Sequence, residues 1–387
     1  MIIMQDQSTS TSSNLFAIDL YKQLKMPNEN LFVSPFSIFT AITMMYVGAR
    51  NETEAELRKI LHITESQRRL PNQVKALVEK LLSIESTEID IANSIWTDLN
   101  YELSESFLYI MDENYNGGVF KEDFSNIDEI CNKVNIWVSE NTKKKIQEII
   151  TPKTFDPSVK LMLLNAIYFN GIWEKTFKEE NTNEAPFYLL NGRITPVPLM
   201  HQKDEFSYFE DDLLQVLELE YKGIQRFGTD EHYSMIIFLP KDKEGLEEME
   251  KKLRFDEINT YIEKLSGQEV KIFIPKFKME TNYNLKDDMR EMGMVKSFSG
   301  DADFSGIVDT SKSLPPIIGE IIHKAFVEVN EEGAEAAAVT LITGVPKGMP
   351  IQREIPVFKA DHPFMFIIYD TQSKTILFMG RLLNPKD

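Results

Sequence analysis

Apolar residues recur along this chain with two different spacings. Where they return every three or four positions, they would line one face of a helix. This spacing predicts helices over residues 16–24, 66–85, 126–150, 244–265 and 285–292. Where apolar residues alternate with polar ones or run together, strands are expected. The expected strands are 89–96, 161–173, 213–221, 233–240 and 270–277, with a closing hairpin of 364–370 and 376–381.

The run 161–173 is almost continuously apolar, which is typical of a strand buried on both faces. Asn165 interrupts this run, and a buried amide must find hydrogen-bond partners. An earlier apolar run leads into Ser34 and Pro35, which suit the cap and the first position of a helix. Capping alone is enough to explain that pair.

The stretch 331–350 supports two interpretations. In an extended conformation, one face is small or apolar throughout and consists of Ala334, Ala336, Ala338, Thr340 and Ile342. The opposite face begins with a charge and consists of Glu335, Ala337, Val339, Leu341 and Thr343. The Glu-rich start and the alanines also fit a helix followed by a turn. Four breakers of regular structure then leave Lys347 at an exposed tip, namely Gly344, Pro346, Gly348 and Pro350.

The start of this stretch and its flanks resemble a known family. The start reads Glu331-Glu332-Gly333-Ala334-Glu335-Ala336-Ala337-Ala338, and the flanks are 319–330 and 358–366. They resemble the serpins, suicide inhibitors of serine and cysteine proteases, from about Asn14 to Pro385. The resemblance implies an α+β serpin fold with three mostly antiparallel sheets, about eight or nine helices and an exposed reactive-centre loop at about 331–350. It also implies a single domain over 1–387, in which we expect residues 1–13 to be frayed.

The resemblance also implies a mechanism. In inhibitory serpins the loop acylates a protease and, once cleaved, inserts as a new strand in the main sheet. Fourteen positions after Gly333, the reactive bond would be Lys347–Gly348, and a Lys there suits trypsin-like serine proteases. A loop one or two residues longer would select Gly348 or Met349 and favour chymotrypsin-like enzymes.

The hinge, residues 331–338, decides whether insertion can occur. Its alanines are small, and no proline lies between Gly333 and Val345. Non-inhibitory serpins, which act as binding proteins or chaperones, tend to carry bulky, charged or proline residues here. Such a role remains the alternative.

Two further sets of residues follow from the resemblance. Ser34, Ser37, Asn165 and His323 would form a buried network where the main sheet opens. Lys276 and Glu331 would form an ion pair that holds the top of that sheet closed, with Trp173 packed nearby.

Acidic side chains outnumber basic ones by 61 to 42, which gives a net charge of −19. This charge disfavours nucleic acid and anionic membranes as partners. Heparin is not expected either, because Glu79 and Glu85 dilute the cations Arg68, Arg69, Lys75 and Lys80. The run Lys143-Lys144-Lys145 is interpreted as ordinary surface.

Cys131 is the single cysteine, so no intrachain disulfide can form, as in a reducing compartment. The apolar start 1–4 is too short for a signal-peptide core, and no apolar run approaches the roughly 20 residues of a membrane span. We therefore expect a cytoplasmic monomer, while export by an unconventional route stays open.

Catalytic and metal-binding motifs are missing from the sequence. The five histidines form no HExxH, the single cysteine rules out CxxC, and GxSxG, GxxxxGK[ST] and GxGxxG are all absent. We expect neither an enzyme nor a cofactor. A triad assembled from distant residues stays open, but His323 is expected to be a hydrogen-bonded core histidine.

Overall fold

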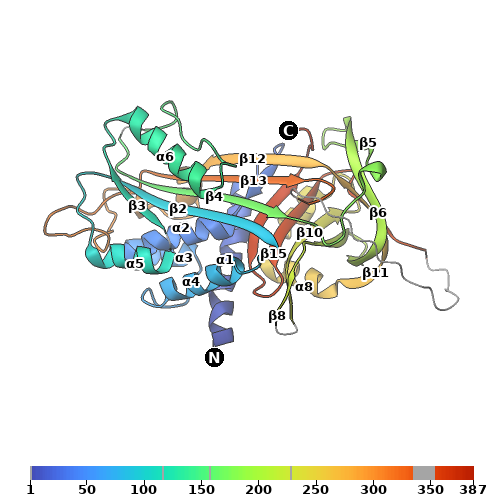
Figure 1. The fold of residues 1–387 in the computed structure, drawn as a ribbon, viewed down its shortest axis with the longest axis horizontal. Helices are drawn as coiled ribbons and strands as arrows, with labels where there is room; N and C mark the ends of the chain where they lie inside the picture. Colours follow the sequence, from blue (N-terminus) through green and yellow to red (C-terminus); the bar gives the residue numbers. More distant parts are fainter. Residues whose placement is uncertain (1, 116, 157, 227–228, 334–353) are drawn as a thin grey trace.

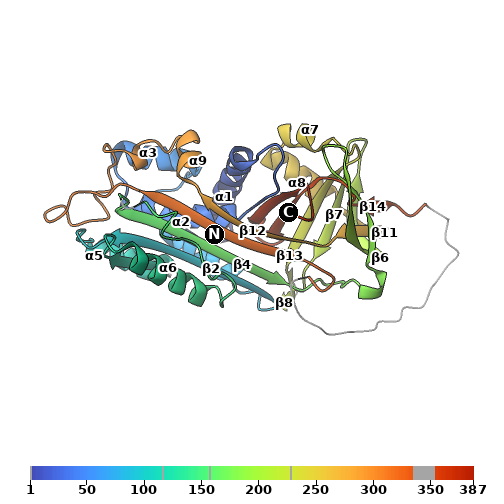
Figure 2. The ribbon, with the colours of Figure 1, turned by 90° about the horizontal axis from the view of Figure 1, so that it is seen from above.

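The computed structural model describes residues 2–115, 117–156, 158–226, 229–333 and 354–387. These residues form three sheets, and helices pack against the two larger ones (Figures 1 and 2). The helices are α1 (Ile2–Leu24), α2 (Pro35–Gly48), α3 (Asn51–Ile60), α4 (Leu70–Leu81), α5 (Glu105–Tyr115), α6 (Ile127–Asn141), α7 (Leu246–Lys251), α8 (Phe255–Lys264) and α9 (Lys286–Glu291). Two short 3-10 helices, η1 (Glu179–Asn181) and η2 (Lys296–Phe298), accompany them.

The main sheet has five strands in the order β12–β13–β4–β2–β3. Their bounds are β2 (Thr87–Asp98), β3 (Gly118–Glu122), β4 (Leu161–Gly171), β12 (Phe277–Asn284) and β13 (Glu320–Val329). The junctions β12–β13 and β2–β4 are antiparallel, whereas β13–β4 and β2–β3 are parallel. The main sheet is therefore mixed rather than antiparallel throughout, although the sheets as a group are mostly antiparallel, as predicted.

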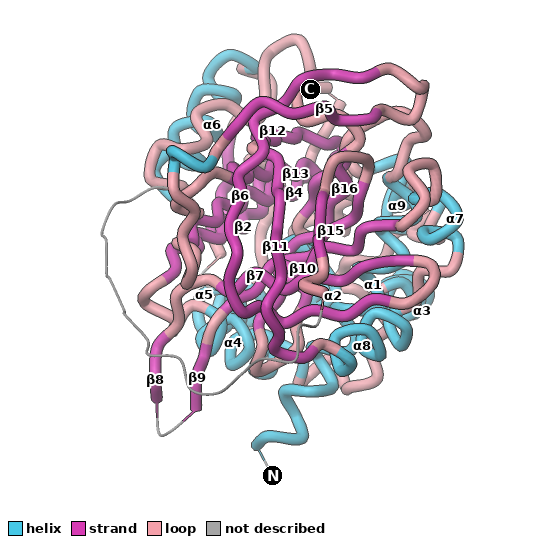
Figure 3. Tube along the Cα trace, turned by 90° about the vertical axis from the view of Figure 1, so that its right-hand side faces the viewer, coloured by secondary structure: helices cyan, strands magenta, loops and turns pink. Residues whose placement is uncertain are grey.

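The second sheet has nine strands, and Figure 3 views the end of the molecule where several of them lie. Its strands are β1 (Leu31–Val33), β5 (Asn183–Tyr188), β6 (Ile194–Glu210), β7 (Leu214–Glu220), β10 (Tyr233–Pro240), β11 (Ser266–Pro275), β14 (Val357–Lys359), β15 (Phe364–Asp370) and β16 (Ile376–Leu382). A small hairpin of β8 (Ile224–Arg226) and β9 (Thr229–Glu231) completes the sheets.

Strand β4 is buried on both faces, as its continuous apolar pattern predicts. On one face Leu163 joins the core that contains Phe39 of α2. On the other face Leu164 packs with Val134 of α6. Because α6 lies on the outside of the main sheet (Figure 1), this strand has no solvent-facing side to carry polar residues.

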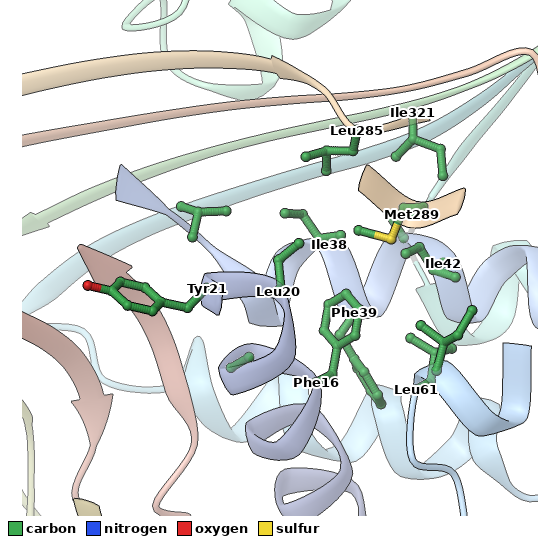
Figure 4. Close-up of a cluster of buried hydrophobic side chains, with 14 of the residues drawn as sticks. Phe16, Leu20, Tyr21, Ile38, Phe39, Ile42, Leu61, Leu285, Met289 and Ile321 are labelled. Carbon is green, nitrogen blue, oxygen red and sulfur yellow. The ribbon is translucent and has the colours of Figure 1, made fainter. Parts of the chain in front are cut away.

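Helices α1 and α2 form the core beneath the main sheet (Figure 4). The rings of Phe16 in α1 and Phe39 in α2 lie 6.2 Å apart, and Ile321 of β13 belongs to the same cluster. Helix α2 begins as predicted, since the Ser34 hydroxyl accepts the Ser37 amide at 3.3 Å and Pro35 is the first helical residue. The Ser34–Pro35 pair therefore fixes where the buried helix starts.

The prediction of a frayed start over residues 1–13 is wrong for residues 8–13. Helix α1 begins at Ile2, and Ser10 and Ser13 are buried. The Ser10 hydroxyl donates to the Ser373 carbonyl at 2.9 Å, and the Asn14 amide donates to the Lys374 carbonyl at 2.7 Å. These polar side chains satisfy backbone groups of the distant β15–β16 turn, which no local pattern reveals.

The predicted helix over 126–150 is too long. Helix α6 ends at Asn141, and Lys143 and Lys144 adopt positive φ angles of 47° and 65°. The following segment leaves the helix because its side chains and carbonyls bond to the sheet beneath it. Ile146 is nevertheless buried, as the periodicity predicts.

Candidate functional site

The candidate site is the parallel junction between β4 and β13 at the centre of the main sheet. Its ladder runs from Glu320 opposite Met162 to Phe326 opposite Tyr168. Beyond the ladder, a further backbone bridge joins Ile172, which follows β4, to Gly333, which lies after the end of β13. The junction is thus closed along most of its length and held at its top by a separate contact.

A buried hydrogen-bond network crosses the closed junction. His323 of β13 lies opposite Asn165 of β4, and the imidazole Nδ1 bonds the amide Oδ1. The Asn165 amide donates in turn to the Ser37 hydroxyl of α2 and to Asn93 Oδ1 of β2. The Ser34 amide donates to His323 Nε2 at 3.2 Å. The structure therefore brings the four sequence-predicted residues together.

Asn93 is a fifth member that sequence reasoning missed. It lies opposite Asn165 in the β2–β4 ladder and is buried. Its signal was an amide on the face of the strand predicted over 89–96 that otherwise carries Ile89, Ile91 and Ile95. A buried polar residue of this kind needs a partner, and here the partner is another amide on the neighbouring strand.

His323 is neutral in this environment. Burial lowers the pKa of His323 to about 3. Because Nε2 accepts a hydrogen bond from Ser34, the proton is assigned to Nδ1, which donates to Asn165. Parting the two strands would break this bond and leave buried polar atoms without partners, at a cost of about 1–3 kcal/mol for each.

Lys276 and Glu331 form an ion pair at the top of the main sheet, the end at which β13 finishes. Lys276 Nζ lies 2.6 Å from Glu331 Oε2, and the Thr182 hydroxyl donates to Oε1 at 2.7 Å. Burial disfavours the charged carboxylate, but the hydrogen bonds from Lys276 and Thr182 prevail and lower the pKa of Glu331. Thr182 was not anticipated from the sequence, because it lies in a loop without a pattern.

Trp173 holds the turn that follows β13. Its backbone amide donates to the Glu332 carbonyl at 2.9 Å, and its indole donates to the Asn330 carbonyl at 3.0 Å. The indole stacks on Tyr221 with ring centroids 4.3 Å apart. The turn at residues 330–333 is therefore hydrogen-bonded to Trp173 in the segment that follows β4.

Gly333 occupies a position that only glycine fits. Its φ angle is +112°, in the region that other residues rarely adopt. A Cβ there would lie 2.2 Å from the Gly171 carbonyl oxygen. This close approach lets Gly333 sit against the end of β4.

A strap formed by residues 142–150 crosses the main sheet on the side of α6. Lys143 pairs with Glu88 and lies 3.6 Å from Asp90, both on β2. Lys145 Nζ lies 5.4 Å from the ring centroid of Tyr168 on β4. These contacts hold one end of the strap on the β2–β4 side of the junction.

The other end of the strap is held beyond the junction. Lys324 of β13 donates to the Glu148 carbonyl at 2.7 Å, and Asn282 of β12 donates to the Ile149 carbonyl at 3.0 Å. The strap therefore spans the line along which β4 and β13 meet. Lys143 lies at the surface, as interpreted from the sequence, and its side chain is 59% exposed, but it also anchors this crossing through Glu88 and Asp90.

Several predicted residues cannot be placed. Hinge residues Ala334, Glu335, Ala336, Ala337 and Ala338, and the predicted bond Lys347–Gly348, lie outside the described residues. Within the described ranges, no group of three or more His, Cys, Asp or Glu side chains is arranged to hold a metal ion. Among the described helices, none is long and apolar enough to cross a membrane.

Comparison with known proteins decides the family. The family model described as serpin (serine protease inhibitor) matches residues 11–385. The chain belongs to the serpin family. A serpin-like protein of Thermococcus kodakarensis is 39% identical, covering 99% of this chain and 87% of its own, and the leukocyte elastase inhibitor of Xenopus laevis is 36% identical, covering 98% and 100%.

Solved serpin structures share the fold. Serpin48 of the insect Tenebrio molitor has a TM-score of 0.85 and 31% identity, covering 98% of this chain and 99% of its own. Human thyroxine-binding globulin, complexed with thyroxine, has a TM-score of 0.86 and 26% identity, covering 98% of this chain and 99% of its own. Relatives therefore include both named protease inhibitors and a hormone-binding protein.

Proposed function

We propose that this serpin is a suicide inhibitor of serine proteases whose cleaved loop inserts between β4 and β13. The position of Gly333 carries the proposal. Its backbone exchanges two hydrogen bonds of 3.3 Å with Asn330 at the end of β13, and it bridges Ile172 at the end of β4. Gly333 therefore already lies between the two strands, and a chain continuing in this register would run antiparallel to both.

Both pairings extend in register along the junction. In an antiparallel pair, each step forward on one strand matches one step back on the other. Seven steps from Gly333 lead to Thr340 on the loop, to His323 on β13 and to Asn165 on β4. The two extensions agree, because His323 and Asn165 face each other in the closed sheet.

This register gives the inserted strand a suitable face. Residues directly opposite in a ladder point to the same side. The face formed by Ala334, Ala336, Ala338, Thr340 and Ile342 would lie opposite the buried residues Val329, Val327, Ala325, His323 and Ile321. Alanines fit there without overpacking, and the Thr340 hydroxyl would meet the two polar groups that insertion separates.

The free energies favour insertion. Ten loop residues, 334–343, would pair along the ten residues of β13. If each of these residues adds one net hydrogen bond worth roughly 1 kcal/mol, insertion stabilises the cleaved protein by on the order of 10 kcal/mol. Breaking the His323–Asn165 bond costs less, about 1–3 kcal/mol for each atom left unpaired.

The chemistry is an interrupted peptide-bond hydrolysis. The protease serine attacks the Lys347 carbonyl, the bond to Gly348 breaks, and the new amino group on Gly348 takes the proton from the serine. An ester then joins the serine to Lys347, and water would normally hydrolyse it. Insertion of about 14 residues at about 3.3 Å each would first carry the ester some 45 Å.

Lys347 supports a trypsin-like target, because its ammonium group matches a pocket with an acidic floor. A register shifted to Gly348 or Met349 would favour a chymotrypsin-like target. The second candidate function is that of a binding protein, and the likeness to thyroxine-binding globulin favours it. The small hinge residues favour inhibition.

The test is a denaturing gel of the protein mixed with trypsin-like and chymotrypsin-like proteases, with mass spectrometry of the released peptide. A covalent complex and a peptide beginning at Gly348 would support the mechanism and the bond. A complex with another peptide would correct the register. Cleavage without a complex, and without a gain in thermal stability, would leave the binding-protein function.

An Ala338→Arg variant sharpens this test. Its side chain would clash with the core opposite Ala325, so the loop should be cleaved but no complex should form. Glu335→Arg, which in this register would lie opposite the exposed Glu328 on the other face, is a control for the added positive charge.

A further inference from the structure

We propose that the space between α7 and α8 is a binding site for a small apolar cation of the arylalkyl amine class. The two helices lie close together over one face of the second sheet (Figure 2). Between them, at the ends of β7, β10 and β15, is a cavity of about 250 Å³. A cavity of roughly 150 Å³ accepts a benzene molecule, so this one has room for one ring and a short chain.

The floor of the cavity is apolar. Leu214, Phe238 and Met365 come from the three strands, and all three are buried. Leu253 and Ile258 close the floor from the helix side and belong to the same core cluster. Because these side chains offer water no hydrogen-bond partner, an apolar ring is the better occupant.

The aromatic wall of the cavity is held in place. The ring of Tyr261 in α8 meets the ring of Phe238 edge to face, with centroids 6.4 Å apart, and its hydroxyl donates to Asp211 Oδ2 at 3.5 Å. Asp211 Oδ1 in turn accepts the amides of Leu213 and Leu214 at 2.8 and 3.0 Å. The cavity is therefore already formed without a ligand, as is usual for small-molecule sites.

The rim of the cavity is acidic. Asp242, Glu248 and Glu257 are exposed there, together with one cation, Lys252. Lys252 Nζ lies 3.5 Å from Glu248 Oε1, so these two charges offset each other. The rim therefore keeps the negative charges of Asp242 and Glu257.

The cations next to the rim are engaged elsewhere. Lys241 pairs with Glu210 at 2.8 Å, and Arg254 pairs with Asp256 at 2.9 Å. Within the described ranges, Asp242 and Glu257 are thus left without an ion pair.

This combination selects the class of ligand. A ring would occupy the apolar floor, and an ammonium group on a short chain would reach the rim near Asp242 and Glu257. An anion of the same shape would be repelled there. Since both carboxylates are exposed, the selectivity should amount to a few-fold in affinity. The cavity is separate from the junction between β4 and β13, so this proposal does not depend on the inhibitory function.

The experiment follows the methionine methyl signals of the full chain, labelled with carbon-13, by NMR. Met249 and Met365 both line the cavity, and the variants Met249→Leu and Met365→Leu identify their signals. The probes are phenethylamine and 3-phenylpropionate, which have a similar shape and opposite charges. Each is titrated at low ionic strength into the wild type, Glu257→Gln and the control Glu263→Gln. Glu263 is also exposed on α8 but does not line the cavity.

We expect phenethylamine to shift the signals of Met249 and Met365 with a Kd on the order of 1 mM, which suits a ligand of this size. It should bind at least about threefold more tightly than 3-phenylpropionate. Glu257→Gln should reduce this preference, whereas Glu263→Gln should keep it.

Three results would overturn the proposal. The first is that the two signals stay in place, or that methionines outside the cavity shift equally. The second is that 3-phenylpropionate binds as tightly as phenethylamine. The third is that Glu257→Gln and Glu263→Gln have the same effect on the preference.

Discussion

His323 and Asn165 lie opposite each other on the two parallel strands at the centre of the main sheet, and their side chains share a buried hydrogen bond. The bond crosses the line along which a new strand would enter. Insertion must therefore break this buried side-chain contact as well as the backbone ladder between β4 and β13. Extending the pairing of Gly333 places Thr340 at the same level, where its hydroxyl could replace the broken bond.

Replacing Thr340 should weaken the cleaved, inserted form. In Thr340→Val, His323 and Asn165 would lose the hydroxyl between them, so the cleaved protein should be less stable by about 1–3 kcal/mol. The intact protein should be unaffected. The measurement is denaturant unfolding of the intact and loop-cleaved forms, with Thr343→Val, on the opposite face, as the control. Equal effects of the two variants would contradict the register.

Acid should destabilise the native protein through His323. Burial lowers the pKa of His323 to about 3, whereas an unfolded histidine titrates near 6.5. The unfolded chain thus gains a proton at a pH where the folded protein still excludes it. This contribution to the free energy of unfolding is full above about pH 6.5 and falls by about 1.4 kcal/mol per pH unit toward pH 3.

The His323 contribution is isolated by comparing wild type with His323→Gln in denaturant unfolding between about pH 7.5 and about pH 5, above most carboxylate pKa values. The stability of the wild type should fall relative to that of the variant. A difference that stays constant over this range would show that His323 is protonated equally in both states.

Gly333→Ala should destabilise the turn after β13. The substitution combines an unfavourable φ of +112° with a contact of 2.2 Å to the Gly171 carbonyl. Gly293→Ala is a matched control, because Gly293 has a φ of +111° and open space around its Cβ position. We expect Gly333→Ala to lower the free energy of unfolding by about 1–3 kcal/mol more than the control. Equal losses of unfolding free energy in the two variants would show that the close approach of Gly333 to the Gly171 carbonyl does not affect stability.

Glu331→Gln should loosen the top of the sheet with a small effect on stability. Lys276 is partly exposed, so the ion pair contributes about 1 kcal/mol or less. Because the pKa of Glu331 is lowered, this contribution is present above the ordinary carboxyl pKa and is lost as the pH falls through the folded value. We expect the loop of Glu331→Gln to insert faster after cleavage, measured by tryptophan fluorescence.

Glu269→Gln is the control for Glu331→Gln, since Glu269 forms a more exposed pair of 2.9 Å with Lys203 away from the junction. Equal insertion rates in both variants would remove the role of Glu331 as a gate.

Lys143→Met should release the strap from β2. The strap joins the two sides of the junction, so parting β4 from β13 must loosen one of its ends. Without the contacts to Glu88 and Asp90, insertion after cleavage should be faster, while the free energy of unfolding should fall by about 1 kcal/mol or less. Lys121→Met removes the exposed pair with Glu102 and is the control. If Lys143→Met inserts its loop at the same rate as Lys121→Met, the strap does not influence insertion.

The sequence by itself determined much of this protein. Apolar periodicity located the strands, because alternation and continuous burial are local consequences of pleat and packing. The polar Asn165 in a run buried on both faces demanded partners, and the family resemblance named two residues to which it is hydrogen-bonded, Ser37 and His323. The glycine and alanines of the hinge predict which side chains could enter a core, and Ala334, Ala336, Ala337 and Ala338 lie outside the described residues.

The tertiary structure decided what local patterns cannot encode. It ended α6 at Asn141 and laid the next residues across the sheet, because Lys324 and Asn282 bond the carbonyls of the strap. It tied Ser10 and Asn14 of the first helix to the distant β15–β16 turn. It also made β4 and β13 parallel neighbours with Gly333 between their ends. Such contacts join residues far apart in the chain, and their energies depend on burial and register that exist only after folding.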